Sequence, residues 1–160
     1  MDLTFSLDHV GLSLTAANLD ATIRWYTSKL DFVVERRFET HGISIAFISH
    51  QDIRIELVGA ASSAGNAPVN DVAATHDSER LHHFCLAVED LKSTLADLHE
   101  RDVHPINEPM EIAEIGQRIA FITDNCGNII ELTEPGTPPA ESRADRASES
   151  SSPSAPDVAR

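Results

Sequence analysis

A chain of 160 residues, 41% of them hydrophobic, can bury the core of one domain or of two small repeats fused into one. Its formal net charge of −14 argues against nucleic acid or an anionic membrane as partner, because both repel an acidic surface. Cys85 and Cys126 lie far apart and in no CxxC pattern, so neither a disulfide framework nor a thiolate zinc site is indicated. The chain starts without a signal-peptide pattern, and no apolar run approaches membrane-spanning length, so we expect a cytoplasmic protein.

Alternation and helical periodicity predict one strand, one helix and three further strands in each half of the chain. In the first half we expect these elements at 5–14, 19–30, 32–39, 43–49 and 52–58. In the second half we expect them at 82–88, 91–101, 103–108, 117–123 and 128–134. Asn18 and Asp90 are the predicted N-caps of the two helices.

The two halves are predicted to be modules of one domain, residues 1–135, with the modules at about 5–58 and 82–134. Small and polar residues dominate 59–81, which we interpret as a linker. From Gly136 onward the chain is rich in Pro, Ser, Ala and charge, so the tail 136–160 is predicted to be disordered.

The halves are related by an internal repeat. His83 follows His9 by 74 residues, Ile119 follows Ile45 by 74, and Glu131 follows Glu56 by 75. Internal duplication indicates two copies of one βαβββ unit. We therefore predict an α+β fold in which two tandem βαβββ modules form a cupped mixed sheet around one cavity.

Strand alternation sorts the neighbours of the repeated residues by face. His9 shares a face with Gly11 and Ser13, and His83 shares a face with Cys85 and Ala87. The larger neighbours of both histidines point the other way, toward the core. The histidine face is therefore predicted to be lined by small residues and to have room for a ligand.

The hairpins are predicted to carry the glutamates on that same face. A three-residue loop at 49–51 would place Glu56 opposite Ser44. Pairing Ile122 with Ile129 would place Glu131 opposite Ala120 and Arg118 opposite Thr133.

Two imidazoles and two carboxylates suit one divalent metal ion, such as Ni, Co, Zn, Mn or Fe. Taken singly, a strand histidine is more often a hydrogen-bonded core residue, and a strand glutamate more often faces solvent. Their recurrence in register favours a metal site made by His9, Glu56, His83 and Glu131. His82 is rejected as a ligand, because alternation places it on the face of Phe84 and Leu86.

The pattern resembles the vicinal oxygen chelate superfamily, which includes glyoxalase I, methylmalonyl-CoA epimerase, extradiol dioxygenases and bleomycin-resistance proteins. The resemblance covers about residues 5–134 and rests on five segments, 7–12, 25–32, 55–57, 81–84 and 127–132. It implies paired βαβββ modules around one metal and assigns the same four ligands. The ligand set is similar to those of bacterial glyoxalase I and methylmalonyl-CoA epimerase.

We therefore predict a metal-dependent isomerase, epimerase or lyase that removes a proton next to a chelated carbonyl of a small carbonyl or thioester substrate. Glu131 is the predicted base, with Glu56 serving the opposite face of the substrate. Arg118 is predicted on the cavity face, where it would bind a substrate carboxylate. We also expect a homodimer.

Two alternatives stay open. A ring-cleaving or other non-haem dioxygenase would need open metal positions for O₂, one of which the second glutamate would fill. A metal-free resistance protein that sequesters a small molecule would use the same cup with aromatic walls, but only 5% of this chain is aromatic.

Overall fold

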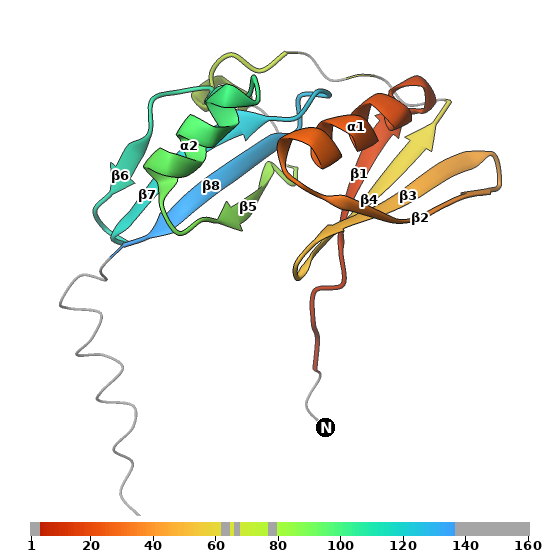
Figure 1. Ribbon diagram of the computed structural model, residues 1–160, viewed down its shortest axis with the longest axis horizontal. Helices are drawn as coiled ribbons and strands as arrows, with labels where there is room; N and C mark the ends of the chain where they lie inside the picture. Colours follow the sequence, from red (N-terminus) through yellow and green to blue (C-terminus); the bar gives the residue numbers. More distant parts are fainter. Residues whose placement is uncertain (1–3, 62–64, 66–67, 77–79, 137–160) are drawn as a thin grey trace, which may run out of the picture.

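The computed structural model describes residues 4–61, 65, 68–76 and 80–136 and confirms the predicted order of elements (Figure 1). The first module contains β1 (Val10–Thr15), a 3₁₀ turn η1 (Ala16–Asn18), α1 (Leu19–Lys29), β2 (Val33–Thr40), β3 (Ile43–His50) and β4 (Ile53–Ala60). The second contains β5 (His83–Ala87), α2 (Leu91–Glu100), β6 (Met110–Ile112), β7 (Gln117–Thr123) and β8 (Ile129–Pro135). A short 3₁₀ turn, η2 (Ala73–Thr75), lies in the linker.

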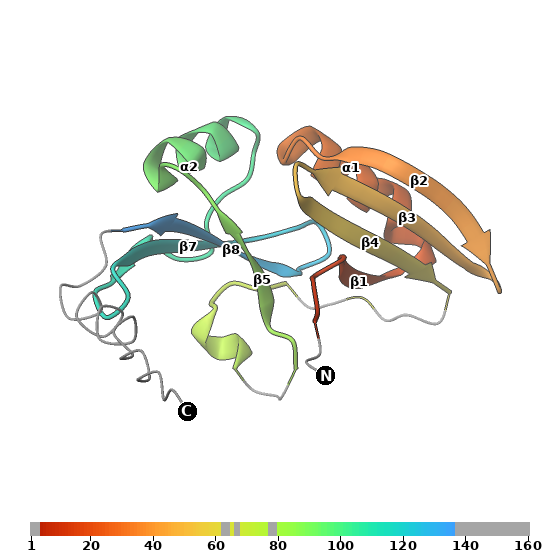
Figure 2. The ribbon, with the colours of Figure 1, turned by 90° about the horizontal axis from the view of Figure 1, so that it is seen from below.

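Each module folds its strands into a four-stranded mixed sheet. The orders are β1-β4-β3-β2 and β5-β8-β7-β6, with β1 parallel to β4, β5 parallel to β8 and the other pairs antiparallel. The α+β class and the tandem βαβββ units are thereby confirmed. The two sheets lie side by side, and both helices cover the same side of them (Figures 1 and 2). Each module thus contributes one sheet of its own to the described part of the chain.

Both helices start at the residue after the predicted cap, but a side-chain capping bond forms only in the second module. The Asp90 carboxylate accepts a hydrogen bond from the Ser93 backbone N–H at 2.7 Å, as an N-cap should. Asn18 makes no side-chain capping bond, and its φ of −90° and ψ of −12° are already helical. Asn18 does stand at the predicted N-cap position, directly before Leu19, but η1 runs into the helix there and its side chain does not cap α1.

The strand predicted at 103–108 is also wrong. Pro105 and Pro109 have no N–H to donate to a ladder. The Val103 N–H instead bonds to the Leu98 carbonyl at 2.8 Å, and the Ile106 N–H bonds to the Phe121 carbonyl at 2.7 Å. Pairing with β7 therefore begins only at Met110.

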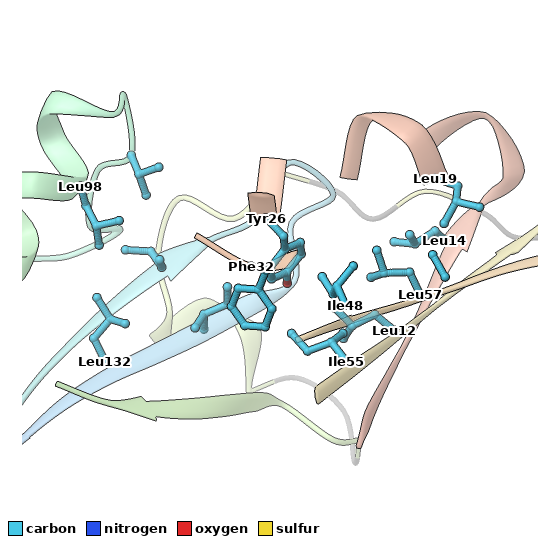
Figure 3. Close-up of a cluster of buried hydrophobic side chains, with 14 of the residues drawn as sticks. Leu12, Leu14, Leu19, Tyr26, Phe32, Ile48, Ile55, Leu57, Leu98 and Leu132 are labelled. Atoms are coloured by element: carbon cyan, nitrogen blue, oxygen red, sulfur yellow. The ribbon is translucent and has the colours of Figure 1, made fainter. Parts of the chain in front are cut away.

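The main hydrophobic core lies between the sheets and the helices and includes residues of both modules (Figure 3). Tyr26 of α1 is fully buried, and its hydroxyl donates to the Asp124 carboxylate, in the turn before β8, at 3.1 Å. Arg101, at the end of α2, donates to the Asp31 carboxylate at 2.7 Å and to the Lys29 carbonyl at 3.0 Å. These contacts join the two modules within one chain.

Part of the linker packs on the second sheet. Val72 is 8% exposed and forms a separate apolar cluster with Ile119, Phe121 and Ile129, and Val69 packs against that cluster. The Val72 N–H donates to the Asn107 side-chain carbonyl at 3.3 Å. The segment 68–76 therefore belongs to the fold of the second module.

The predicted tail 136–160 lies outside the described residues except for Gly136. None of the helices in the described part of the chain is long and apolar enough to cross a membrane.

Candidate functional site

The strand registers place both glutamates opposite phenylalanines. Glu56 pairs with Phe47, three positions from the predicted Ser44, and Glu131 pairs with Phe121, one position from the predicted Ala120. The β3–β4 loop has two residues, with Gln51 at φ 51°, instead of the predicted three. The predicted hairpin registers are therefore wrong, although the glutamates do share a face with the histidines.

The wall of each site is consequently more aromatic than predicted. The Phe47 ring meets the His9 ring edge-on with centroids 5.5 Å apart, and Phe121 meets His83 at 5.6 Å. The predicted small neighbours are also present, because Gly11 stands beside Glu56 and Cys85 beside Glu131 in the parallel strand pairs. Each site thus combines small residues on one strand with a phenylalanine on another.

The first half-site, defined here as His9 and Glu56, brings together a residue just before β1 and one on β4. The His9 Nε2 lies 3.4 Å from Glu56 Oε2, and the side chains are 33% and 24% exposed. The His9 Nδ1 donates to the Asp8 carboxylate at 2.7 Å, and this hydrogen bond is the main reason why the pKa of Asp8 is lowered. Arg54 also contacts Asp8, at 3.3 Å.

The second half-site, defined here as His83 and Glu131, repeats this arrangement on β5 and β8. The His83 Nε2 lies 2.7 Å from Glu131 Oε2, and the side chains are 31% and 17% exposed. Cys85 stands next to Glu131 across the parallel strands. Burial, and then the Glu131 charge, raise the pKa of the Cys85 thiol to about 11, so this thiol stays protonated near neutral pH and is a poor metal ligand.

A row of hydrogen bonds runs from the linker to the second half-site. Thr75 Oγ1 lies 2.6 Å from His82 Nε2, and His82 Nδ1 lies 2.9 Å from His83 Nδ1. The His76 ring stacks on His82 with centroids 4.3 Å apart. Burial, followed by the charges of His76 and His83, lowers the pKa of His82, so the ring is neutral at physiological pH.

The two half-sites stay separate within one chain. Among residues 4–61, 65, 68–76 and 80–136, no three His, Cys, Asp or Glu side chains gather closely enough to hold one metal ion. A cavity of about 610 Å³ lies between β1 and β5 and is bordered by linker residues. Of the four predicted ligands, His83 is the one that lines this cavity.

Arg118 lies on the other face of its sheet. Its register partner is Glu134, three positions from Glu131 along β8, and the two side chains form an ion pair at 3.5 Å. The Glu134 carboxylate also accepts from the Leu91 N–H at the start of α2 at 2.8 Å, so this face is the helix side. The prediction that Arg118 shares the cavity face with Glu131 is therefore wrong.

Sequence reasoning missed the contacts of Asp8 and His82 with the two histidines. Each residue immediately precedes its histidine, and the interval between them is 74 residues, the same as between His9 and His83. A polar, hydrogen-bonding residue at the same place in both repeats was the available signal. His82 was considered only as a rival ligand.

The chemistry of each half-site fits two neighbouring ligands of a divalent ion. Ligand atoms at about 2.0–2.2 Å from one ion are separated by about 3 Å, and the observed separations of 3.4 and 2.7 Å bracket that value. The Nδ1 of each histidine already has a partner, which leaves its Nε2 directed at the glutamate. Each pair is therefore suited to a metal, while the complete set of four requires the two pairs to be brought together.

Comparison with known proteins places this chain in a family. A sequence model of the Glyoxalase/Bleomycin resistance protein/Dioxygenase superfamily matches residues 6–132. Because the match covers most of the chain, the protein belongs to this superfamily, as the resemblance in sequence implied.

Individual relatives are distant. Human mitochondrial methylmalonyl-CoA epimerase is 20% identical over 127 residues, which cover 78% of this chain and 70% of the human protein. A glyoxalase family protein from Enterococcus faecalis has a TM-score of 0.68 at 20% identity, over 81% of this chain and 97% of its own. The trypanothione-dependent glyoxalase I of Leishmania major has a TM-score of 0.57 at 20% identity, over 91% and 95%. At these identities the solved structures establish the fold alone.

Proposed function

We propose that this protein is a metal-dependent isomerase, epimerase or lyase that removes a proton from the carbon next to a carbonyl in a small carbonyl or thioester substrate. One observation carries the proposal. In each module a strand-borne carboxylate faces the Nε2 of a histidine, and both carboxylates are partly exposed, at 24% for Glu56 and 17% for Glu131. The similarity to methylmalonyl-CoA epimerase supports this class of reaction.

His9, Glu56, His83 and Glu131 would hold one divalent ion of Ni, Co, Zn, Mn or Fe. When bound, the ion supplies Lewis acidity that stabilises negative charge on a substrate oxygen. Because the half-sites are separate in one chain, they must be brought together either by the two modules of a chain or by modules of two chains. The homodimer that we propose supplies the second route.

Glu131 is the proposed base. Its carboxylate is the less exposed of the two, and Phe121 stands directly opposite it on β7. Phe121 packs with Val72 of the linker, so apolar side chains limit the access of water beside this carboxylate. Glu131 would accept the substrate proton and return it, while Glu56 would serve the opposite face.

The experiment is proton exchange in D₂O, followed by NMR, on a panel of 2-methyl thioesters, hemithioacetals and simple 2-hydroxy carbonyl compounds. We expect deuterium to enter the carbon beside the carbonyl of at least one substrate, and chelation of the metal to abolish this exchange. Consumption that needs O₂ and shows no exchange would favour a dioxygenase. Tight binding of a small molecule by metal-free protein, without turnover, would favour a sequestering protein.

A further inference from the structure

An aromatic row on the first sheet begins at the first half-site and ends at an arginine. The Phe47 ring, which stands opposite Glu56, meets the His9 ring with centroids 5.5 Å apart. The Phe38 ring of β2 stacks beside Phe47, with centroids 6.4 Å apart and an angle of 19° between the ring planes. The Arg36 guanidinium lies over Phe38, 5.4 Å from the ring centroid. The row therefore leads from a proposed metal ligand to a fixed positive charge.

The strand register places Arg36 on the same face of the sheet as Glu56. Glu56 pairs with Phe47, and Phe47 pairs with Arg36, so the three residues lie in one line across β4, β3 and β2. Residues paired directly across antiparallel strands present their side chains on the same face. Neighbouring strands are about 4.8 Å apart, so roughly 10 Å separates the backbones of Glu56 and Arg36. An anion bound by Arg36 would thus lie at a defined distance from the half-site.

The first sheet leaves this face open, whereas the linker covers the equivalent face of the second sheet. Phe121 and Ile119 follow Phe47 and Ile45 by 74 residues, and they are 8% and 7% exposed because they pack with Val72. Phe47 and Ile45 are only partly buried and belong to neither apolar cluster of the described chain. In Figure 2, which views the sheets from the side away from the helices, no described helix or strand crosses β2, β3 or β4. The first sheet therefore has room for a ligand where the second sheet carries its own chain.

Two arginines lie on the aromatic rings of this face, and they differ in their partners. The Arg54 guanidinium lies 4.2 Å from the Phe47 centroid, but it is neutralised by Glu35 at 2.7 Å and by Asp8 at 3.3 Å. Arg36 forms no ion pair with a carboxylate of residues 4–61, 65, 68–76 or 80–136. An arginine has a planar fork of N–H donors that matches carboxylates and phosphates. Arg36 is thus the cation on this face that is available to a ligand.

We propose that Arg36 binds an anionic group of the substrate, and that Phe38 and Phe47 support the apolar part between that group and the reacting carbonyl. The inference rests on the proposed function in that the carbonyl is placed at the first half-site. The substrate class is then a carbonyl or thioester compound with an anionic group about 10 Å from the reacting carbon. Arg36 would take the role that the sequence assigned to Arg118, which lies on the helix side.

Two dyes of matched shape test the anion site directly on the full-length protein. Anilinonaphthalene sulfonate carries an anionic group on an aromatic frame, and phenylnaphthylamine is the same frame without the sulfonate. Fluorescence titration should show that the protein binds the sulfonate more tightly than the neutral dye. The titration is repeated with EDTA, because a metal ion also attracts a sulfonate. We expect the same affinity in both conditions.

Substitutions then assign the binding to the aromatic row. Arg36→Met keeps an unbranched stem on Phe38 but removes the charge, so it should weaken sulfonate binding by roughly tenfold, the usual effect of losing a hydrogen bond to a charged group. Binding of the neutral dye should not change. Phe38→Ala should weaken the binding of both dyes. Arg24→Met is the matched control, because it removes the same charge from an exposed arginine of α1, on the other side of the sheet (Figure 1).

A pair of substrates connects the anion site to the reaction. One is a 2-methyl thioester with a carboxylate about 10 Å from the reacting carbon, and the other is its methyl ester. Arg36→Met should raise KM for the acid by roughly tenfold and leave kcat unchanged, because the contact is made equally in the ground state and the transition state. The KM for the methyl ester should stay the same.

Equal sulfonate affinity in wild type and Arg36→Met would overturn the inference, and so would an unchanged KM for the acid in this variant. Sulfonate binding that weakens as the protein concentration rises would also overturn it, because a second copy of the chain would then cover this face. Loss of binding on addition of EDTA would assign the sulfonate to a metal ion and contradict the role of Arg36. Sulfonate binding that depends on Arg36, without deuterium exchange into either thioester, would support the anion site and contradict the proposed function alone.

Discussion

Asp8 and His82 hold equivalent places in the two modules, because each contacts the Nδ1 of the histidine that follows it, at 2.7 and 2.9 Å. The chain therefore repeats the partner of each proposed ligand as well as the ligand itself. The two partners differ in hydrogen-bonding capacity. A carboxylate only accepts hydrogen bonds, whereas an imidazole can donate from one nitrogen and accept at the other. The two half-sites therefore occupy equivalent strand positions but differ in the hydrogen-bonding partner of their histidine.

Removing one member of either half-site should strip the metal. We expect purified protein to carry about one divalent ion per chain or per completed site. Both Glu56→Ala and His83→Ala should lose most of this metal, because each substitution removes one of the four ligands. Elemental analysis measures the metal content. Glu39→Ala, which removes an exposed carboxylate on β2, is the control. Full metal retention in both site variants would contradict the four-ligand proposal.

Glu131→Gln should separate metal binding from proton transfer. The amide keeps one oxygen that can coordinate, but it cannot accept the proton. We expect partial metal binding and a fall in kcat of roughly two to four orders of magnitude, the usual contribution of a general base. Glu56→Gln is the comparison, because it changes the other proposed ligand in the same way. Equal losses of kcat in the two variants would argue against Glu131 as the principal base.

The hydrogen bonds of Asp124 should stabilise the contact between the modules. Its carboxylate accepts from the Tyr26 hydroxyl, from the Cys126 and Asn128 backbone N–H groups and from the Asn128 amide. Tyr26→Phe removes one of these bonds and should lower the free energy of unfolding by about 1 kcal/mol, whereas Asp124→Ala should cost about 2–4 kcal/mol. Chemical denaturation gives both values, and the reverse order would contradict this account.

Introducing a charge at Val72 should release the linker from the second sheet. Val72 is 8% exposed and packs with Phe121, so Val72→Asp would bury an unpaired carboxylate there. We expect faster hydrogen exchange in peptides covering 68–76 and 117–123, measured by mass spectrometry. Ala74→Asp, at an exposed position in the same segment, should leave both rates unchanged. Equal effects of the two substitutions would show that Val72 does not hold the linker.

Much of the fold was predictable because its signals are local. Alternation around His9 and His83 separates the core face from the site face correctly, and Leu12, Leu14, Phe84 and Leu86 do pack in or against the core. The repeat interval places equivalent residues on equivalent strands, so the βαβββ order and the pairing of each histidine with a glutamate follow from the sequence. Asp90 was recognisable as a cap because a cap bonds within one turn.

The registers could not be read from the sequence, because Ile45, Ala46, Phe47 and Ile48 are all apolar. Either alternate row could face the core, and only packing against the helices selects Ala46 and Ile48. The position of Arg118 depends on the register of the other hairpin in the same way.

Tertiary structure alone decided the surroundings of the second half-site. The linker folds back on β7 and β8 and brings Val72 and Thr75 to His82. No periodicity in the sequence predicts this contact. The separation of the two His–Glu pairs is likewise set by how the two sheets pack, since strand alternation orients a side chain but does not bring distant strands together.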